Sequence, residues 1–86
     1  MVQKEVIVKG ATGLHARPGS DLVELAMPFH SKILIVHKGK EINAKEVLEI
    51  LTANINCGDS VLLKAEGEDE QDALDTLVSY LETMEG

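Results

Sequence analysis

The residues with the clearest chemical potential lie in segment 12–20, Thr-Gly-Leu-His-Ala-Arg-Pro-Gly-Ser. This segment follows a stretch rich in β-branched residues and precedes a helical pattern. We therefore expect His15 at the N-terminal end of a helix, with Pro18 in the first turn, where its missing N–H costs little. Unpaired backbone N–H groups and the positive end of the helix dipole meet at such a position. Together with the guanidinium of Arg17, which can bind two oxygens at once, they favour a phosphoryl group.

The imidazole of His15 is the group that could accept that phosphoryl group. A neutral imidazole nitrogen is a competent nucleophile near pH 7, and the positive helix end disfavours the imidazolium. The pattern thus predicts reversible N-phosphorylation of His15, with Arg17 stabilising the phosphate. By itself, a His close to an Arg at a helix start is more often a cap or a surface residue. The residues alone leave that alternative open.

Length and composition exclude several classes of protein. The chain has 86 residues, 44% of them hydrophobic, with no Trp, one Tyr and one Phe. Such a chain supports one aliphatic core and has no room for a second domain around a deep cleft. We therefore expect one domain over residues 1–86. One cysteine, Cys57, and three scattered histidines provide neither a disulfide nor zinc-ligand spacing, so we expect no metal site and no cofactor.

The charge distribution argues against nucleic-acid binding. Fifteen acidic and eight basic residues give a net charge of −7, and the sequence has no basic cluster and few aromatics to stack on bases. The acidic C-terminal stretch is interpreted as a solvated helix face. No apolar run approaches the ~20 residues of a membrane span. We expect a cytoplasmic protein without membrane insertion.

Periodicity predicts seven elements. Residues 2–9, 32–37, 40–43 and 61–66 have the β-branched content or alternation of strands, with Lys38 and Gly39 turning the second into the third. A helix is expected from Ala16, ended near Pro28, and another after Gly67. A short helix should follow Asn43 and Glu46, which resemble a capping box. The remaining histidines, His30 and His37, are expected to be surface residues.

The order βαββαβα predicts an α+β fold with an antiparallel sheet and helices on one face. Val47, Leu48, Ile50 and Leu51 of the short helix spread over about 160°, at 100° per residue, which is wider than one buried stripe needs. Some of them should therefore face solvent. The order of the strands cannot be obtained from periodicity.

Residues 13–18, Gly-Leu-His-Ala-Arg-Pro, resemble the phosphorylation-site motif of HPr, the histidine-containing phosphocarrier family of the bacterial phosphotransferase system. The similarity extends to the chain length, the order of elements, the Asn-Ala-Lys run at 43–45 and the Gly-Glu-Asp-Glu run at 67–70. It thus covers essentially the whole chain.

The resemblance implies an HPr-like open-faced β-sandwich, with a four-stranded antiparallel sheet in the order 1-4-2-3 covered by three helices. It also implies that His15 accepts phosphate on Nδ1 from phospho-Enzyme I and donates it to Enzyme IIA domains for sugar uptake. The backbone N–H groups of Ala16 and Arg17, and the Arg17 side chain, would hold the phosphate. Such a protein is a phosphocarrier rather than an enzyme, and we expect a monomer.

The resemblance further implies an apolar docking surface for these partners, made of Ser20, Val47, Leu48 and Leu51. At position 46, many HPr proteins have a regulatory Ser, whereas this chain has Glu46. Control by HPr kinase/phosphorylase at that position is therefore lost. Glu46 is either a plain capping residue or a partial mimic of phosphoserine.

Two alternatives to sugar uptake remain open. One is a regulatory HPr paralogue that acts mainly by docking on another protein. The other is a carrier in a nitrogen-related or dihydroxyacetone-kinase relay. The presence of His15 and Arg17 argues against the first alternative. The sequence does not name the sugar or the Enzyme IIA that is served.

Overall fold

The computed structural model describes residues 1–11, 13–15 and 17–84. Its elements are β1 (Val2–Ile7), α1 (Arg17–Ala26), β2 (Lys32–His37), β3 (Lys40–Asn43), α2 (Val47–Thr52), β4 (Ser60–Glu66) and α3 (Glu70–Thr83). The predicted βαββαβα order is confirmed. The bounds of β2 and β3 are those expected, whereas β1 ends two residues earlier than expected.

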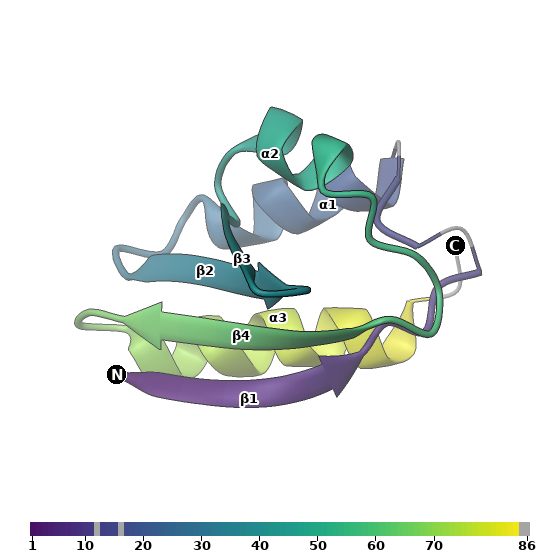
Figure 1. Ribbon diagram of the computed structural model, residues 1–86. Helices are drawn as coiled ribbons and strands as arrows, with labels where there is room; N and C mark the ends of the chain where they lie inside the picture. The colour runs from purple at the N-terminus through teal and green to yellow at the C-terminus, as the bar shows by residue number, and fades with distance from the viewer. Residues whose placement is uncertain (12, 16, 85–86) are drawn as a thin grey trace.

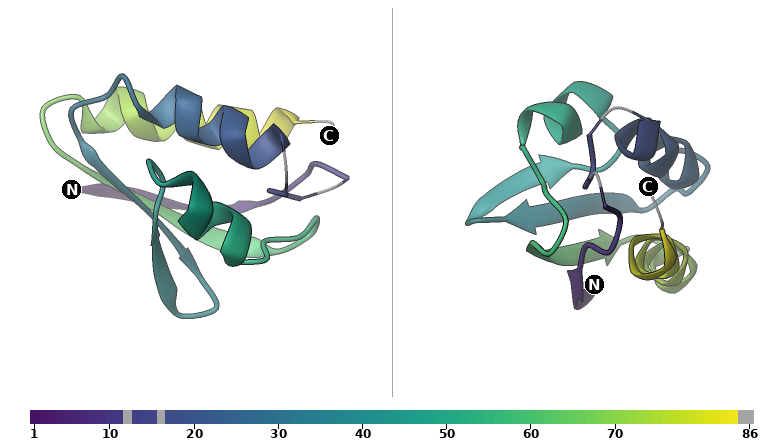
Figure 2. Two further views of the ribbon diagram at one scale, coloured as in Figure 1. Left: turned by 90° about the horizontal axis from the view of Figure 1, so that it is seen from above. Right: turned by 90° about the vertical axis from the view of Figure 1, so that its right-hand side faces the viewer.

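The four strands form one antiparallel sheet in the order β1-β4-β2-β3 (Figure 1), which confirms the order 1-4-2-3. The helices lie on one side of this sheet, with α1 and α3 side by side and α2 next to α1 (Figure 2). Among the described residues, no helix packs on the opposite face of the sheet (Figure 2). The fold is thus the expected open-faced β-sandwich.

Alternation along the strands explains which side chains form the core. In β2, Ile33 and Ile35 are buried, and in β4 the same holds for Val61 and Leu63, while their neighbours in sequence are more exposed. Successive strand residues point to opposite faces, so these side chains face the helices. An apolar stripe along α3 and its C-cap completes the core from the other layer, because Leu74, Leu77, Leu81 and Met84 are all buried.

Helix α1 is shorter than its apolar pattern suggests. It ends at Ala26, two residues before Pro28, as proline's effect on a helix predicts. Leu22, Leu25, Ala26 and Phe29 follow the i, i+3, i+4, i+7 spacing of a helical stripe, but Phe29 lies beyond the end of the helix. Its side chain is half-buried and still packs against the core.

The predicted capping box at α2 is wrong. Glu46 is the N-cap residue, but its side chain makes no capping hydrogen bond. The carboxylate that reaches back is that of Glu49, whose Oε1 accepts the backbone N–H of Asn43 at 3.0 Å. The Asn43 side chain instead accepts the N–H of Lys45 at 2.9 Å, an Asx turn that competes with the cap.

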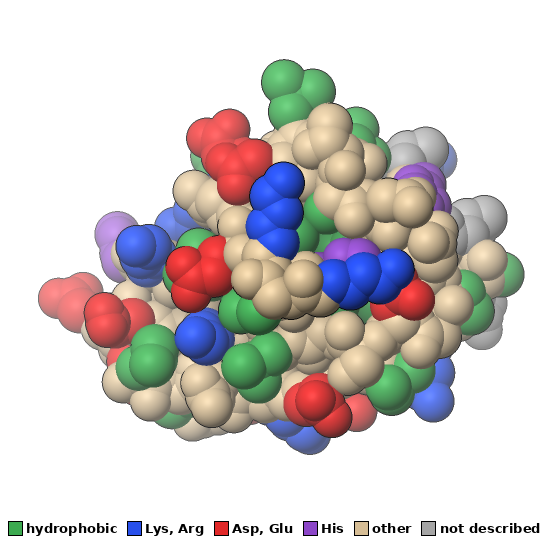
Figure 3. Space-filling model, in the orientation of Figure 1, with side chains coloured by type: hydrophobic (Ala, Val, Ile, Leu, Met, Phe, Trp, Pro, Cys, Tyr) green, Lys and Arg blue, Asp and Glu red, His purple; other side chains and the backbone are tan. Residues whose placement is uncertain are grey.

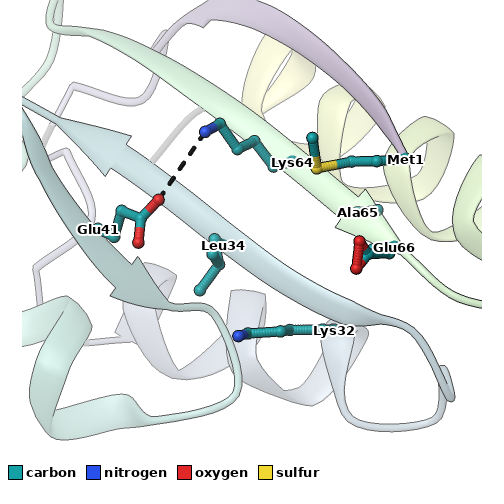
Figure 4. A pocket seen from close by; sticks show the side chains of 7 residues that line it. All are labelled: Met1, Lys32, Leu34, Glu41, Lys64, Ala65 and Glu66. Atoms are coloured by element: carbon teal, nitrogen blue, oxygen red, sulfur yellow. Dashed lines mark ion pairs between the residues drawn. The ribbon is translucent and has the colours of Figure 1, made fainter.

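A shallow pocket of about 250 Å³ lies on the open face of the sheet, near the end of β4 and the start of β2 (Figure 4). Its lining residues are Met1, Lys32, Leu34, Glu41, Lys64, Ala65 and Glu66. Lys64 and Glu41 form an ion pair of 3.8 Å across it. The loop that contains His15 is at the other end of the sheet, so this pocket is not part of the predicted site.

Within the described ranges, no helix is long and apolar enough to cross a membrane. The same residues form no group of three or more His, Cys, Asp or Glu side chains that could hold a metal ion.

Candidate functional site

The loop before α1 is held against the turn before β4 by a close backbone contact. Leu14 donates its N–H to the carbonyl of Ile55 at 2.9 Å, and its side chain is fully buried. Gly13 has a φ of +67°, and a Cβ at this position would lie 2.4 Å from the Ile55 carbonyl oxygen. Glycine is therefore required here both by its backbone angle and by the close approach. These contacts place His15 next to segment 54–59.

His15 is half-buried just before α1 and makes a hydrogen bond with Asn56. Its Nε2 lies 2.8 Å from Oδ1 of Asn56, a residue 41 positions further along the chain. The orientation of the Asn56 amide is determined by a second contact, because its Nδ2 donates to the carbonyl of Asn54 at 3.1 Å. The oxygen of the amide thus faces the imidazole.

This contact determines which nitrogen of His15 has the proton. An amide oxygen only accepts hydrogen bonds, so Nε2 must be the donor. In the neutral ring, Nδ1 then has the lone pair. The described residues provide no hydrogen-bond partner for Nδ1. The geometry therefore leaves the lone pair on Nδ1, and Nδ1 is the atom that the HPr resemblance implies as the phosphate acceptor.

Asn56 is in turn connected to a buried histidine through Asp59. The Oδ2 atom of Asp59 accepts the backbone N–H of Asn56 at 3.0 Å and lies 2.9 Å from Nε2 of His37. The hydrogen bond from the Asn56 backbone, followed by that from His37, lowers the pKa of the Asp59 carboxyl below its usual value. At neutral pH, Asp59 is accordingly a carboxylate that only accepts hydrogen bonds.

His37 corrects an expectation from the sequence. It lies at the end of β2, as predicted, but it is only 4% exposed rather than at the surface. The alternation of β2 explains this result, because Ile33, Ile35 and His37 point to the same, helix-covered face. A buried polar side chain needs a partner, and Asp59 provides it.

Arg17 is the first residue of α1 and is exposed, and it forms no ion pair with the other described residues. Its guanidinium is thus available to an incoming anion next to His15. The other predicted phosphate contact, the N–H of Ala16, lies outside the described residues. Pro18 is the second residue of the helix and lies in its first turn, as expected.

The residues of the predicted docking surface come from two neighbouring helices. Ser20 is exposed on α1, while Leu48 of α2 is 72% exposed. Val47 and Leu51 are half-buried, and Ile50 is the one residue of α2 that is fully buried in the core. Figure 3 shows hydrophobic side chains projecting over α2. The expectation that some apolar residues of this helix face solvent is thus confirmed.

Close packing of α1 on α2 depends on Gly19, which is buried. A Cβ there would lie 2.9 Å from the carbonyl oxygen of Leu14 and 3.1 Å from Cδ2 of Leu51. A side chain at this position would press on both the His15 loop and α2. Gly19 therefore brings the predicted docking residues close to the loop that contains His15.

Sequence reasoning missed Asn56, Asp59 and His37 as neighbours of His15. Segment 54–59 contains Asn, Gly and Asp residues typical of a turn, but no local pattern indicates that this segment meets a loop some 40 residues earlier. The alternation of side chains along segment 32–37 places His37 on the same face as Ile33 and Ile35, so this signal could have predicted that His37 is buried. A buried histidine would then have called for an acidic partner.

Comparisons with known proteins identify the family of the chain. The model described as "PTS HPr component phosphorylation site" matches residues 2–83. An HPr-like protein Crh from Halalkalibacterium halodurans is 42% identical over 82 residues, covering 95% of this chain and 98% of that protein.

Solved structures give the same result. A phosphocarrier protein HPr from Bacillus anthracis is 38% identical with a TM-score of 0.92, over 94% of this chain and 96% of that one. An HPr dimer from Thermoanaerobacter tengcongensis is 38% identical with a TM-score of 0.72, over 92% and 91%. The fold and the motif define a phosphocarrier of the phosphotransferase system. The chain belongs to the HPr family.

Proposed function

We propose that this protein accepts a phosphoryl group from phospho-Enzyme I on His15 and donates it to Enzyme IIA domains for sugar uptake. The observation that carries this proposal is the hydrogen bond from Nε2 of His15 to Asn56, which leaves Nδ1 as the nucleophile next to the exposed Arg17. Phosphoryl transfer requires mainly positioning and charge stabilisation. His15 would provide the acceptor atom, and Arg17 would provide the charge.

The proposal treats residues 1–86 as one phosphocarrier domain in the cytoplasm, passing phosphate between protein partners. Arg17 and the backbone N–H groups of Ala16 and Arg17 hold the phosphate. Ser20, Val47, Leu48 and Leu51 dock against the partners. A monomer remains the expectation for this chain, and size-exclusion chromatography with light scattering tests it, since a related HPr has been solved as a dimer.

Incubation with phosphoenolpyruvate and an active Enzyme I tests the transfer. Intact mass should show one added phosphate that is acid-labile and base-stable, and His15→Ala should abolish it. Arg17→Ala should slow transfer at least about tenfold while the fold is retained, because a charge-assisted hydrogen bond contributes ~1.5 to 3 kcal/mol. No mass gain in the parent protein would remove the phosphocarrier proposal. A smaller effect of Arg17→Ala would remove its assigned role.

A regulatory role is the second candidate, because an HPr-like protein Crh is among the relatives of this chain. Such a protein would act by docking through α2 without needing phosphate on His15. The His15→Ala variant separates the two functions. Loss of sugar uptake in cells with this variant supports the carrier, whereas unchanged uptake with altered gene regulation supports the regulator.

A further inference from the structure

We propose that Asn56 is a positioning residue for His15, and that Asp59 and His37 hold Asn56 in place. This inference rests on the proposed function and deepens it, because it names the groups that select the reacting nitrogen. The three residues form one continuous chain of hydrogen bonds from the buried end of β2 to the imidazole.

The first step is the orientation of the Asn56 side chain. Its Nδ2 donates to the Asn54 carbonyl at 3.1 Å, so its Oδ1 is directed to Nε2 of His15 at 2.8 Å. The reverse orientation would place an amide N–H next to the ring and a carbonyl oxygen next to another carbonyl. Asn56 thus accepts a hydrogen bond from the Nε2–H group and stabilises the tautomer in which Nδ1 is unprotonated.

The second step is the position of the turn itself. Asp59 accepts the Asn56 backbone N–H through its side chain, and its own N–H donates to the Asn56 carbonyl at 3.0 Å. His37 donates to the same carboxylate oxygen at 2.9 Å and is 4% exposed, so it cannot swing into solvent without leaving the core. The residue that orients His15 is therefore fixed to the sheet.

The third step is the choice of an amide rather than a carboxylate. A carboxylate next to Nε2 would also accept a hydrogen bond from it, but its charge would stabilise the imidazolium, in which Nδ1 is protonated and has no free lone pair. A neutral amide selects the tautomer without that effect. In this series of hydrogen bonds the negative charge is on Asp59, which contacts Asn56 and not the His15 ring.

The transfer step then needs no proton movement at His15. The lone pair of Nδ1 forms the new N–P bond, and the electron pair of the broken bond stays with the donor group. Nε2 keeps its proton and its hydrogen bond to Asn56, so the phosphorylated ring, substituted on both nitrogens, has a formal positive charge next to the negatively charged phosphoryl oxygens. In the other tautomer, Nδ1 would have to lose a proton first, while Nε2 would face the protein.

The direct test is NMR of the His15 ring nitrogens in the unphosphorylated protein, which requires no Enzyme I. In the parent protein, at a pH where the ring is neutral, the ¹⁵N shifts should be those of the Nε2–H tautomer. Asn56→Ala should move the two nitrogen shifts toward each other, because both tautomers become populated. Asp59→Asn should give a smaller change in the same direction. Cys57→Ser, an exposed neighbour in the same turn, is the control.

The second test is kinetic. Asn56→Ala should lower kcat/KM for phosphorylation by Enzyme I about three- to tenfold, the range expected for one hydrogen bond. Asn56→Asp keeps the acceptor but adds charge, so its rate should fall at neutral pH and recover as the pH rises. A merely structural role for Asn56 would not shift the pH profile.

Unchanged ¹⁵N shifts in Asn56→Ala would overturn the proposal, as would an Asn56→Asp profile identical to that of the parent. The NMR result is independent of the proposed function. If Enzyme I does not phosphorylate the parent, the carrier function fails, and the nitrogen shifts still decide whether Asn56 positions the ring.

Discussion

At the scale of single residues, the structure removes one of the two roles expected for Glu46. The sequence allowed two roles, a capping residue or a partial mimic of phosphoserine. The Glu46 side chain is exposed and makes no capping hydrogen bond, and the carboxylate of Glu49 accepts the N–H of Asn43, three residues before the N-cap. The stabilising role is therefore removed, and the fixed charge of Glu46 is what is left to test.

We expect Glu46→Ser to accelerate phosphorylation of His15 severalfold. A carboxylate has about half the charge of phosphoserine, and its effect on an acidic partner is screened over roughly 8 to 10 Å. Stability should stay the same or rise by up to ~1 kcal/mol, because Ser is a favoured N-cap residue. Transfer rates at low and moderate salt, together with thermal unfolding, measure both effects. Equal rates for the variant and the parent at both salt concentrations would reject the mimicry.

At the scale of elements, α2 is a helix of six residues with one fully buried side chain, Ile50. A helix this short has little stability of its own and depends on packing against α1 and β3. Val47 and Leu51 are half-buried, whereas Leu48 is the most exposed apolar residue of the helix. An exposed apolar residue beside a reactive site is typical of a partner interface.

Leu48→Asp should weaken binding to Enzyme I or Enzyme IIA at least about tenfold, with a stability loss below ~0.5 kcal/mol, as is usual for surface changes. Binding is measured by calorimetry and stability by denaturant unfolding. Ser79→Asp, which adds the same charge on the exposed side of α3, should leave binding unchanged. Ile50→Ala is the core control and should cost ~2 to 5 kcal/mol. A large loss of stability in Leu48→Asp would place the docking surface elsewhere.

The elements also show what could be predicted from the sequence. The strand and helix patterns are local, so periodicity predicted all seven elements. The order of the strands came from the family resemblance instead. Contacts between distant segments, such as His15 with Asn56 or Asp59 with His37, have no local signal and required the structure.

At the scale of the whole molecule, Asp69 connects the helix layer to the sheet. It lies just before α3, within the acidic run that the sequence suggested was a solvated face. Its carboxylate accepts the backbone N–H groups of His30 and Ser31, each at 2.9 Å, and the hydroxyl of Ser31. Ser31 directly precedes β2 and is buried. One carboxylate thus fixes the start of a central strand to the start of the longest helix.

We expect Asp69 to make the protein acid-sensitive. The hydrogen bond from the Ser31 side chain, followed by that from the His30 backbone, lowers the pKa of Asp69 from 3.8 to about 2. Between these two values the unfolded chain binds more protons than the folded one. The stabilisation is therefore complete at neutral pH and is lost as the pH falls from about 4 to about 2.

Asp69→Asn should lower the melting temperature at pH 7 by several degrees, and the difference from the parent should shrink as the pH falls from about 4 to about 2. Thermal unfolding followed by circular dichroism across this range measures the difference. Asp59 and Glu70 also have lowered pKa values, so the parent-minus-variant difference, rather than the parent curve alone, isolates Asp69. Asp72→Asn, an exposed carboxylate in the first turn of the same helix, is the matched control. If the Asp69→Asn and Asp72→Asn curves are the same, the contacts of Asp69 with segment 30–31 do not stabilise the fold.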